Sequence, residues 1–344
     1  MVKKVSTLSD MAKLAGVSES TVSRALSNSK LISVKTRERI QALAKEANFS
    51  INTTARNLRL QKSNTIAVVL LIHSENDQST TDPFILRLLG VIADELTKMG
   101  YDMLLASHTQ PDEQSLKNYF DSKRADGVIV FGQGNDPAIF ENLTNNNKPF
   151  VVWGTKDPKA RYVTVGTDNR LGGQLATEHL IEQGCKNIVY AGHMTIETEL
   201  RYQGYQEAMS KALLSPAPLI DVHFTYQDGY NVATALLQEG EFNFDGVVAA
   251  SDTIALGMLK AFNDFNATKD DTEKAPAFSI VGYDDIEVAK FTHPSLTTIR
   301  QNTQAGGKRL VELLFKQINK AEAHSFELET QLIERDSSKL RIAK

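Results

Sequence analysis

The spacing of hydrophobic and polar positions changes at about residue 64. Before that point apolar residues recur every three or four positions, and after it continuous apolar runs of strand length alternate with helical patterns. We expect strands at 65–72, 102–106, 127–131, 150–153, 187–191, 246–250 and 278–283, and helices that include 84–99, 171–183, 201–213, 253–265 and 305–319. This alternation is typical of parallel sheets covered on both faces. We therefore predict an α/β body of two doubly wound lobes, with a ligand cleft at the carboxyl ends of the strands.

Residues Thr7–Leu26 have the pattern of two short helices joined by a tight turn, which is typical of an all-α helix-turn-helix domain. Gly16 permits the positive φ that the turn needs, and Ser18 is a suitable N-cap for the second helix. A third helix from Ser33 to about Asn48 completes a small domain, with Ile40, Ala42, Leu43 and Ala44 as its apolar face.

The outward face of the second helix carries polar residues that suit contacts with bases. An arginine can bond guanine bidentately and a carboxylate can accept a hydrogen bond from cytosine. Basic residues in the first turns of the third helix suit phosphate groups, although solvated charges are the alternative for Lys35, Arg37 and Arg39. The candidate DNA-binding residues of this domain are Thr7, Ser18, Glu19, Ser20, Ser23, Arg24, Ser33, Thr36 and Arg37. A hairpin of two amphipathic helices with solvated polar residues is the structural alternative.

Charge is distributed unevenly along the chain. Residues 1–62 contain 12 Lys and Arg against 4 Asp and Glu, which leaves 26 of the 38 basic and 38 of the 42 acidic residues for the rest. The head therefore carries +8 and the body −12, which together give the net charge of −4. A basic head on an acidic body indicates that the head binds a polyanion. No amphipathic or apolar anchor accompanies the charge, so the polyanion is expected to be nucleic acid and not a membrane surface.

Cysteine usage and hydropathy indicate a cytoplasmic protein. The single Cys185 excludes an internal disulfide, and no apolar run reaches the length of a membrane span. Residues 1–6 are basic, but Ser9, Asp10 and Lys13 interrupt any apolar segment of the kind found in secretion signals.

Together with the segment INTTARNLRLQK at 51–62, these patterns resemble the lactose/galactose repressor family of bacterial transcription regulators over nearly the whole chain. In that family the segment is a hinge that becomes helical when two subunits bind an operator, and a leucine enters the minor groove. The resemblance implies that Leu58 is this leucine and that Asn52 and Ala55 belong to the DNA-contacting hinge. The family often has Pro before the hinge Asn, where this chain has Ile51.

The resemblance also implies a body of two lobes related to periplasmic sugar-binding proteins. The expected domains are the head at 1–50, the hinge at 51–63 and the effector-binding and dimerisation domain at 64–344. We expect the chain to cross between the lobes near Val163, Thr292 and Phe326.

Polar and aromatic residues at several expected strand ends suit a small hydroxylated ligand, because a sugar needs an aromatic face and charged partners for its hydroxyls. The candidates are Asp82, Phe84, Trp153, Arg201 at the start of a helix, Phe224, Ser251, Asp252 and Asp284. By resemblance, Arg201, Phe224 and Asp284 match effector-contacting residues, whereas Ser251 stands where many relatives have Asn. The alternatives are an Arg201–Asp284 ion pair, core positions for Phe84 and Trp153, and helix caps for Asp252 and Asp285.

No catalytic constellation is present in the sequence. The seven His lack metal-ligand spacing, and no GxSxG motif occurs. Gly132–Gly134 and Gly306–Lys308 lack the remaining positions of nucleotide-binding fingerprints and are better explained as turns or helix packing. We therefore expect no enzyme activity and no cofactor.

The leading hypothesis is a homodimeric repressor of carbohydrate-utilisation genes that binds an inverted repeat in double-stranded DNA, since one helix-turn-helix contacts too few bases. A mono- or disaccharide effector controls its operator affinity. A purine or another non-sugar metabolite is the alternative effector, and a solute-binding receptor or a sugar-modifying enzyme is the alternative class. No leucine heptads follow LIERDSSK, which favours a dimer over a tetramer.

Overall fold

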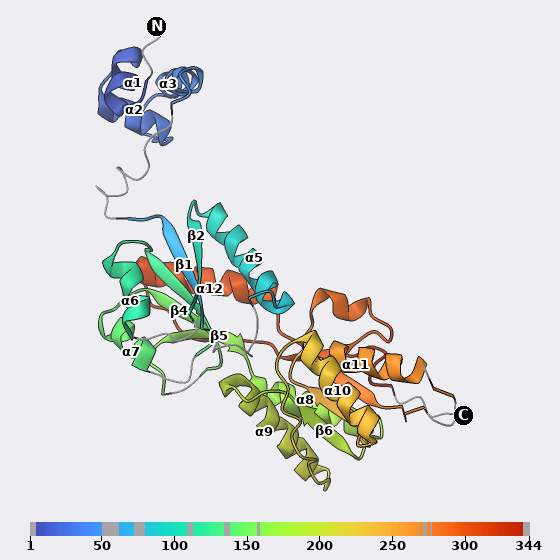
Figure 1. The fold of residues 1–344 in the computed structure, drawn as a ribbon. Coiled ribbons are helices and arrows are strands. Elements are labelled where there is room, and N and C mark those ends of the chain that lie inside the picture. Colours follow the sequence, from blue (N-terminus) through green and yellow to red (C-terminus); the bar gives the residue numbers. More distant parts are fainter. Residues whose placement is uncertain are drawn as a thin grey trace. The chain divides into compact units, whose positions relative to one another are not determined.

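The computed structural model describes residues 5–49, 62–71, 80–108, 113–133, 138–156, 159–267, 269–270, 274–275 and 277–339. The chain forms two compact units, 1–63 and 64–344, which are described separately below (Figure 1). We call the first unit the head and the second the body.

The head consists of the helices α1 (Leu8–Ala15), α2 (Glu19–Leu26) and α3 (Val34–Glu46). Each begins at a hydroxyl residue whose side chain accepts a hydrogen bond from a backbone N–H of the first turn: Thr7, Ser18 and Ser33. Gly16 ends α1 at φ 64°, a left-handed conformation that costs glycine little.

One small apolar core holds these three helices together. Met11, Val22, Ala25 and Ile40 are completely buried, so the side chains of α1, α2 and α3 meet in a single cluster. Ala42 is exposed, and the expectation that it lies on the apolar face of α3 was wrong. It lies two residues after Ile40 and two before the buried Ala44, and residues two apart on a helix do not share a face.

In the body, the first lobe is built on a parallel sheet with the strand order β10-β5-β4-β3-β1-β2. Its strands are β1 (Thr65–Leu71), β2 (Asp102–His108), β3 (Gly127–Phe131), β4 (Phe150–Trp153), β5 (Val163–Thr167) and β10 (Phe326–Leu328). Helices α5 (Pro83–Lys98) and α12 (Thr303–Ile318) cover one face, and α6 (Glu113–Asp121) and α7 (Ala138–Asn145) cover the other (Figure 1).

The continuous apolar run of β1 follows from this layering. Ile66, Val68 and Leu70 point into the core beneath α5 and α12, whereas Ala67 and Val69 point into the core beneath α6 and α7. All five side chains are completely buried. A strand covered on both faces needs apolar residues at every position, as the sequence pattern predicted.

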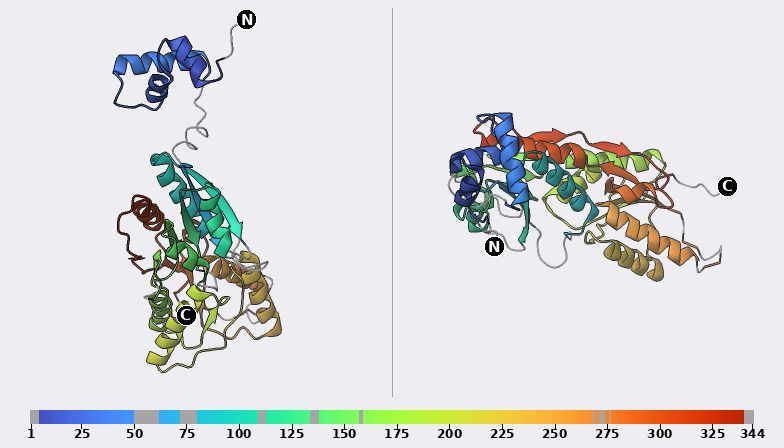
Figure 2. Two further views of the ribbon diagram at one scale, coloured as in Figure 1. Left: turned by 90° about the vertical axis from the view of Figure 1, so that its left-hand side faces the viewer. Right: turned by 90° about the horizontal axis from the view of Figure 1, so that it is seen from above.

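The second lobe has the strand order β11-β9-β8-β7-β6, in which only β11 is antiparallel to its neighbour. Its strands are β6 (Ile188–Ala191), β7 (Gly246–Ala249), β8 (Ser279–Asp284), β9 (Thr297–Arg300) and β11 (Gln331–Ile333). Its helices are α8 (Asn169–Glu182), α9 (Ile196–Lys211), α10 (Tyr226–Glu239), α11 (Asp252–Ala267) and the short 3₁₀ helix η1 (Glu287–Lys290). The two lobes lie side by side in Figure 1 and in the right-hand view of Figure 2.

The chain crosses between the lobes three times, but later at each crossing than the sequence predicted. The segments that cross follow β5, β9 and β10, at Asp168, Gln301 and Thr330. The predicted positions, Val163, Thr292 and Phe326, lie at the start of or before these three strands. The strands are short or polar and could not be recognised as strands, so the crossings were placed too early.

Within the described part of the chain, no helix is both long and apolar enough to span a bilayer.

Candidate functional site

On the head, α2 presents a polar face to solvent. Glu19, Ser20 and Arg24 are exposed and Ser23 is half-buried, whereas Val22 and Ala25 on the other side are buried. Among the described residues, the guanidinium of Arg24 has no hydrogen-bond or ion-pair partner. Its donors are therefore available for a guanine or a phosphate.

Several other candidate DNA-binding residues have local structural contacts. Thr7 forms a reciprocal capping box with Asp10, whose pKa is lowered chiefly by the hydrogen bond from the Thr7 hydroxyl. The Ser33 hydroxyl lies 2.8 Å from that of Thr36. A hydroxyl that caps a helix accepts a backbone hydrogen bond and keeps one O–H donor, which is the group that a phosphate oxygen can accept from.

The basic residues of α3 differ in their environment. Arg39 donates to the carbonyl oxygen of Ala15 at 2.9 Å, so it ties α3 to the end of α1. Lys35 is exposed and Arg37 is half-buried, and neither has a partner among the described residues. The hinge candidates Asn52, Ala55 and Leu58 lie outside the described residues.

In the body, a cavity of about 140 Å³ lies between the lobes at the carboxyl ends of the strands. Six of the predicted effector residues line it: Phe84, Trp153, Arg201, Phe224, Ser251 and Asp284. The sequence analysis did not single out the other polar side chains of the lining, which are Gln133, Thr167, Asn169, Thr195, Glu197, Thr198 and Gln301.

Three aromatic side chains, those of Phe84, Phe131 and Trp153, belong to the part of the lining contributed by the first lobe. Phe84 at the start of α5 and Trp153 at the end of β4 lie with their ring centroids 5.6 Å apart and their planes at 55°. Both side chains are also largely buried, so each belongs to the core and lines the cavity as well. A Cβ at Gly306 of α12 would overlap the Trp153 ring, which shows that this glycine serves helix packing.

Arg201 is the cation of the cavity lining. It lies in the second turn of α9, which begins at Ile196, so the expectation that it starts the helix was wrong. Close packing of α8 on α9 brings it here, because a Cβ at Gly173 would overlap the Arg201 backbone. Its Nε donates to Asn169 Oδ1 at 2.9 Å and its Nη1 to the Ala250 carbonyl oxygen at 2.6 Å.

The guanidinium of Arg201 also stacks on an aromatic ring. Its Cζ lies 3.6 Å from the centroid of the Tyr283 ring, a cation–π arrangement. Within the described residues no ion pair joins Arg201 to Asp284. The alternative of a structural pair between them was therefore wrong, and both groups line the cavity separately.

Asp284 ends β8 in a strained conformation. Its φ of 117° is rare for a residue with a side chain, and such strain is concentrated at functional sites. Its Oδ1 accepts a hydrogen bond from Gln301 Nε2 at 2.7 Å. Burial raises the pKa of Asp284 to about 7, against the opposing effect of Arg201.

Two predicted effector residues do not line the cavity. Asp82 caps α5, since its Oδ1 accepts hydrogen bonds from the backbone N–H groups of Phe84 and Ile85. Asp252 is completely buried, and its carboxyl oxygens accept from the Ile286 N–H and the Thr298 hydroxyl. Burial raises its pKa well above the ordinary value. Asp82 therefore stabilises the start of α5, and Asp252 holds the segments at Ile286 and Thr298 in place.

Gln301 connects the two lobes at the cavity. It lies on the second crossing and is largely buried. Its amide nitrogen donates to Asp284 in the second lobe, and its amide oxygen accepts from the Thr167 hydroxyl of the first lobe at 3.1 Å. A ligand that bonds to Asp284 therefore affects the hydrogen bonds by which Gln301 links the two lobes.

The described residues contain no cluster of His, Cys, Asp or Glu that could hold a metal ion.

The comparisons with known proteins match both units. A model of "Bacterial regulatory proteins, lacI family" matches residues 7–52, and a model of "Periplasmic binding protein-like domain" matches residues 177–338. The HTH-type transcriptional repressor PurR of Pasteurella multocida (strain Pm70) is 30% identical over 351 residues, which cover 98% of this chain and all of that protein. This chain belongs to the lacI family of bacterial regulatory proteins.

Solved structures of lacI-family members agree with this assignment. The lac repressor dimer bound to operator and the anti-inducer ONPF has a TM-score of 0.81 at 23% identity, with 97% of this chain and 99% of that chain covered. The complex of the transcriptional regulator CelR with cellobiose has a TM-score of 0.67 at 29% identity, with coverages of 96% and 99%. The predicted family and fold class are confirmed. This lacI-family chain is a DNA-binding transcription regulator and not an enzyme.

Proposed function

We propose that this chain is a homodimeric repressor whose operator affinity is set by a single polar ring system bound between the lobes. The observation that carries the proposal is the Asp284–Gln301–Thr167 connection, because it joins a cavity carboxyl of one lobe to a strand of the other. An effector that binds unequally to two lobe arrangements shifts their populations, typically with a coupling energy of about 1–3 kcal/mol.

A purine base is the effector class that we favour. The cavity of about 140 Å³ matches one flat ring system, since an engineered apolar cavity of about 150 Å³ holds benzene. Aromatic faces and side-chain amides in its lining suit the faces and the N–H and C=O edges of a heterocycle. The similarity to the repressor PurR over the full chain supports this class.

A sugar is the second candidate, because the related regulator CelR was solved with cellobiose. The carboxyl of Asp284 and the aromatic pair of Phe84 and Trp153 suit hydroxyl groups and C–H faces equally well.

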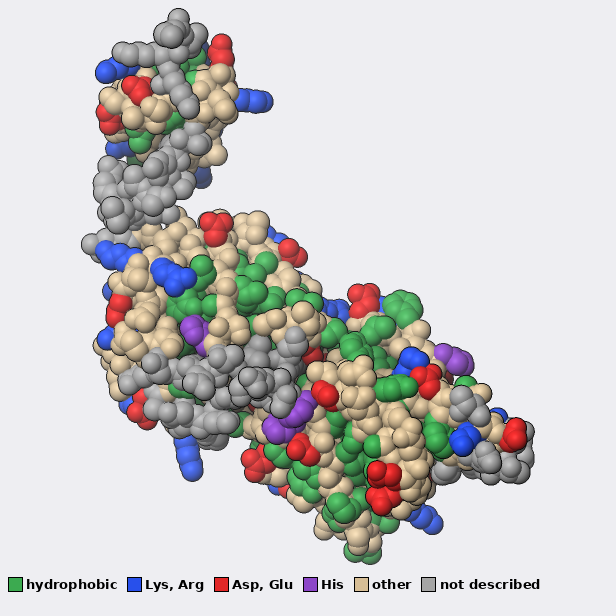
Figure 3. All heavy atoms as spheres, in the orientation of Figure 1, with side chains coloured by type: hydrophobic (Ala, Val, Ile, Leu, Met, Phe, Trp, Pro, Cys, Tyr) green, Lys and Arg blue, Asp and Glu red, His purple; other side chains and the backbone are tan. Residues whose placement is uncertain are grey.

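Apolar side chains on the surface of the first lobe support the homodimer. Leu86 and Met99, on or next to α5, and Leu105 on β2 are each about half exposed, at 51%, 48% and 49%. Figure 3 shows hydrophobic side chains gathered on the surface over β2 and α5. Because β2 is an edge strand, a second copy placed here covers both this patch and the edge.

Two measurements on the full chain test the proposal. Fluorescence polarisation with a palindromic DNA library measures operator recognition, and the absence of any preference for two-fold symmetric sites would refute the repressor. Fluorescence of Trp153 during titration with adenine, guanine, hypoxanthine and xanthine, and in parallel with glucose, ribose and cellobiose, identifies the effector class. Saturable binding of sugars alone would replace the purine by the second candidate.

A further inference from the structure

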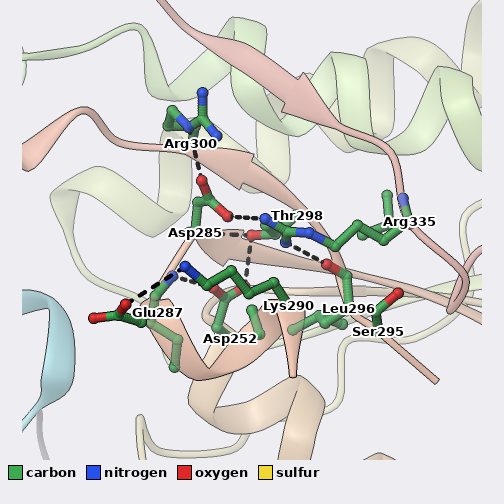
Figure 4. A network of polar contacts seen from close by, with 12 residues as sticks. Asp252, Asp285, Glu287, Lys290, Ser295, Leu296, Thr298, Arg300 and Arg335 are labelled. Carbon is green, nitrogen blue, oxygen red and sulfur yellow. Dashed lines mark hydrogen bonds and ion pairs between the residues drawn. The ribbon is translucent and has the colours of Figure 1, made fainter. Parts of the chain in front are cut away.

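A second cavity, of about 280 Å³, lies beside the effector cavity at the junction of the two lobes. Both lobes and the second crossing contribute to its lining. The charged residues of the lining are Arg87, Asp285, Glu287, Lys290, Arg300 and Arg335. Figure 4 shows the charged side chains of the second lobe around Asp285 at this place.

The charge of this lining is opposite to that of the body around it. Four cations, Arg87, Lys290, Arg300 and Arg335, meet two carboxylates, those of Asp285 and Glu287, so the lining carries +2. The acidic body outside the head carries a net negative charge. A positive cavity with low-dielectric walls concentrates anions.

Asp285 holds two of the cations in place. Its Oδ2 accepts from Arg300 Nε at 2.7 Å and its Oδ1 from Arg335 Nη2, while Arg335 Nη1 donates to the Leu296 carbonyl oxygen at 2.6 Å (Figure 4). The structural alternative for Asp285 was a helix cap, but its carboxyl group binds two arginines instead. Burial opposes the charge of Asp285, yet the hydrogen bonds from Arg335 and Arg300 lower its pKa.

These bonds leave much of the donor capacity of the cavity unused. A guanidinium has five N–H donors, of which Asp285 and Leu296 occupy one on Arg300 and two on Arg335. Arg87 of α5 has no hydrogen-bond or ion-pair partner among the described residues. Lys290 lies 3.4 Å from Glu287 in an exposed pair, which is a weak interaction.

We propose that this cavity binds a small anion with at least two negative charges, such as a phosphate ester or a polycarboxylate, as a second ligand of the protein. Pre-oriented guanidinium groups match the planar, bidentate geometry of both anion types. A neutral base or sugar would leave this excess positive charge uncompensated. Arg87 comes from the first lobe and the other cations from the second, so the anion joins the lobes.

The anion site is adjacent to the effector site. Gln301 lines both cavities, and Asp284 and Asp285 are consecutive residues that face one cavity each. The backbone there is held at φ 117° and 55°. The anion therefore stabilises the lobe arrangement in which this segment and α5 are close.

The test is calorimetric titration of the full chain with pyrophosphate and, separately, with citrate at low ionic strength. The test variant is Arg87→Ala/Lys290→Ala, because neither side chain is buried or bonded to a core group. Its matched control is Lys35→Ala/Arg37→Ala, which removes two cations from the basic head instead. Retained binding of a purine or sugar effector, or an unchanged circular dichroism spectrum, shows that the test variant is folded.

We expect saturable binding of at least one anion by the wild type, a loss of about tenfold or more in the test variant and no loss in the control. Binding of pyrophosphate alone assigns the site to phosphate groups, and binding of citrate alone assigns it to carboxylates. No binding of either anion, or an equal loss in the head variant, overturns the proposal.

Discussion

The substitution Asp284→Asn is expected to change the stability of the body and its affinity for the effector in opposite directions. The carboxyl of Asp284 is buried beside the acidic groups of Asp82 and Asp252, and its pKa rises from an ordinary value of 3.8 to about 7. The folded state therefore binds a proton that the unfolded chain releases. The free energy of unfolding consequently falls as the pH rises from about 4 through 7.

The size of the effect follows from the pKa. A difference of about 3 pKa units corresponds to about 4 kcal/mol at about 1.4 kcal/mol each, which is an upper limit for the cost of ionising this group in the fold. Asn is uncharged, has an oxygen that can accept the Gln301 hydrogen bond, and tolerates positive φ. We expect Asp284→Asn to raise the free energy of unfolding by about 2–4 kcal/mol at pH 8 and by less than half as much at pH 5, because only about one of the three pH units between the two pKa values has been crossed there.

Urea denaturation followed by the fluorescence of Trp153, the single tryptophan, reports on the body. The matched control is the neighbouring variant Asp285→Asn. The pKa of Asp285 is lowered, so its carboxylate contributes stability that is present above the ordinary pKa and is lost as the pH falls through the lowered value. The control is expected to be destabilised at pH 8. An equal change at pH 5 and pH 8 in Asp284→Asn, or destabilisation at pH 8, would refute the reasoning.

The affinity for the effector should fall in Asp284→Asn, although the body becomes more stable. A charge-assisted hydrogen bond contributes about 1.5–3 kcal/mol, so Asp284→Asn is expected to weaken effector affinity about tenfold or more while it stabilises the body. Such a trade between stability and binding is usual for groups held in a binding site. Calorimetric titration with the effector measures it.

Four further substitutions test other parts of the protein. Arg24→Ala should cost about 1–3 kcal/mol on operator DNA and less on random DNA in polarisation assays, and equal losses would contradict base readout. Met11→Ala removes a completely buried side chain, at about 2–5 kcal/mol, and should abolish DNA binding while effector titrations stay unchanged. Leu105→Asp should shift the dimer toward monomer in analytical ultracentrifugation, and an unchanged mass would move the interface elsewhere. Gly306→Val should displace the Trp153 ring and alter its emission, whereas wild-type emission would contradict the close packing.

The sequence predicted the elements whose apolar pattern is strong. The central strands, such as β1, are apolar throughout because both faces are covered. The strands β5 (VTVGT), β9 (TTIR), β10 and β11 were missed because they are short or polar, and β10 and β11 lie at sheet edges. Helices α6, α7 and α10 were not among those named from the sequence, since α6 and α7 have only 9 and 8 residues and the first half of α10 contains Gln227, Asp228, Gly229 and Asn231.

The candidate site was predictable where residue type alone suggests a role. Aromatic residues indicated the cavity, as did the charges of Arg201 and Asp284 together with the family resemblance, and the structure places them in its lining. Gln133 and Gln301 were not predicted, because an amide at a strand end resembles any loop residue. Their positions depend on the path of the crossing segments, which the apolar pattern does not encode.

The three crossings determine when each lobe can be completed during synthesis. The other strands of the first lobe end by Thr167, but this lobe also needs α12 and β10 from late in the chain. The second lobe likewise needs β11. The first lobe is therefore not whole until Leu328 has left the ribosome, and the second not until Ile333 has. A nascent chain can fold its head early, but the two lobes that enclose the cavity are not complete until β10 and β11 have been synthesised. Premature termination between residues 64 and 325 thus yields a head whose body lacks β10 and β11.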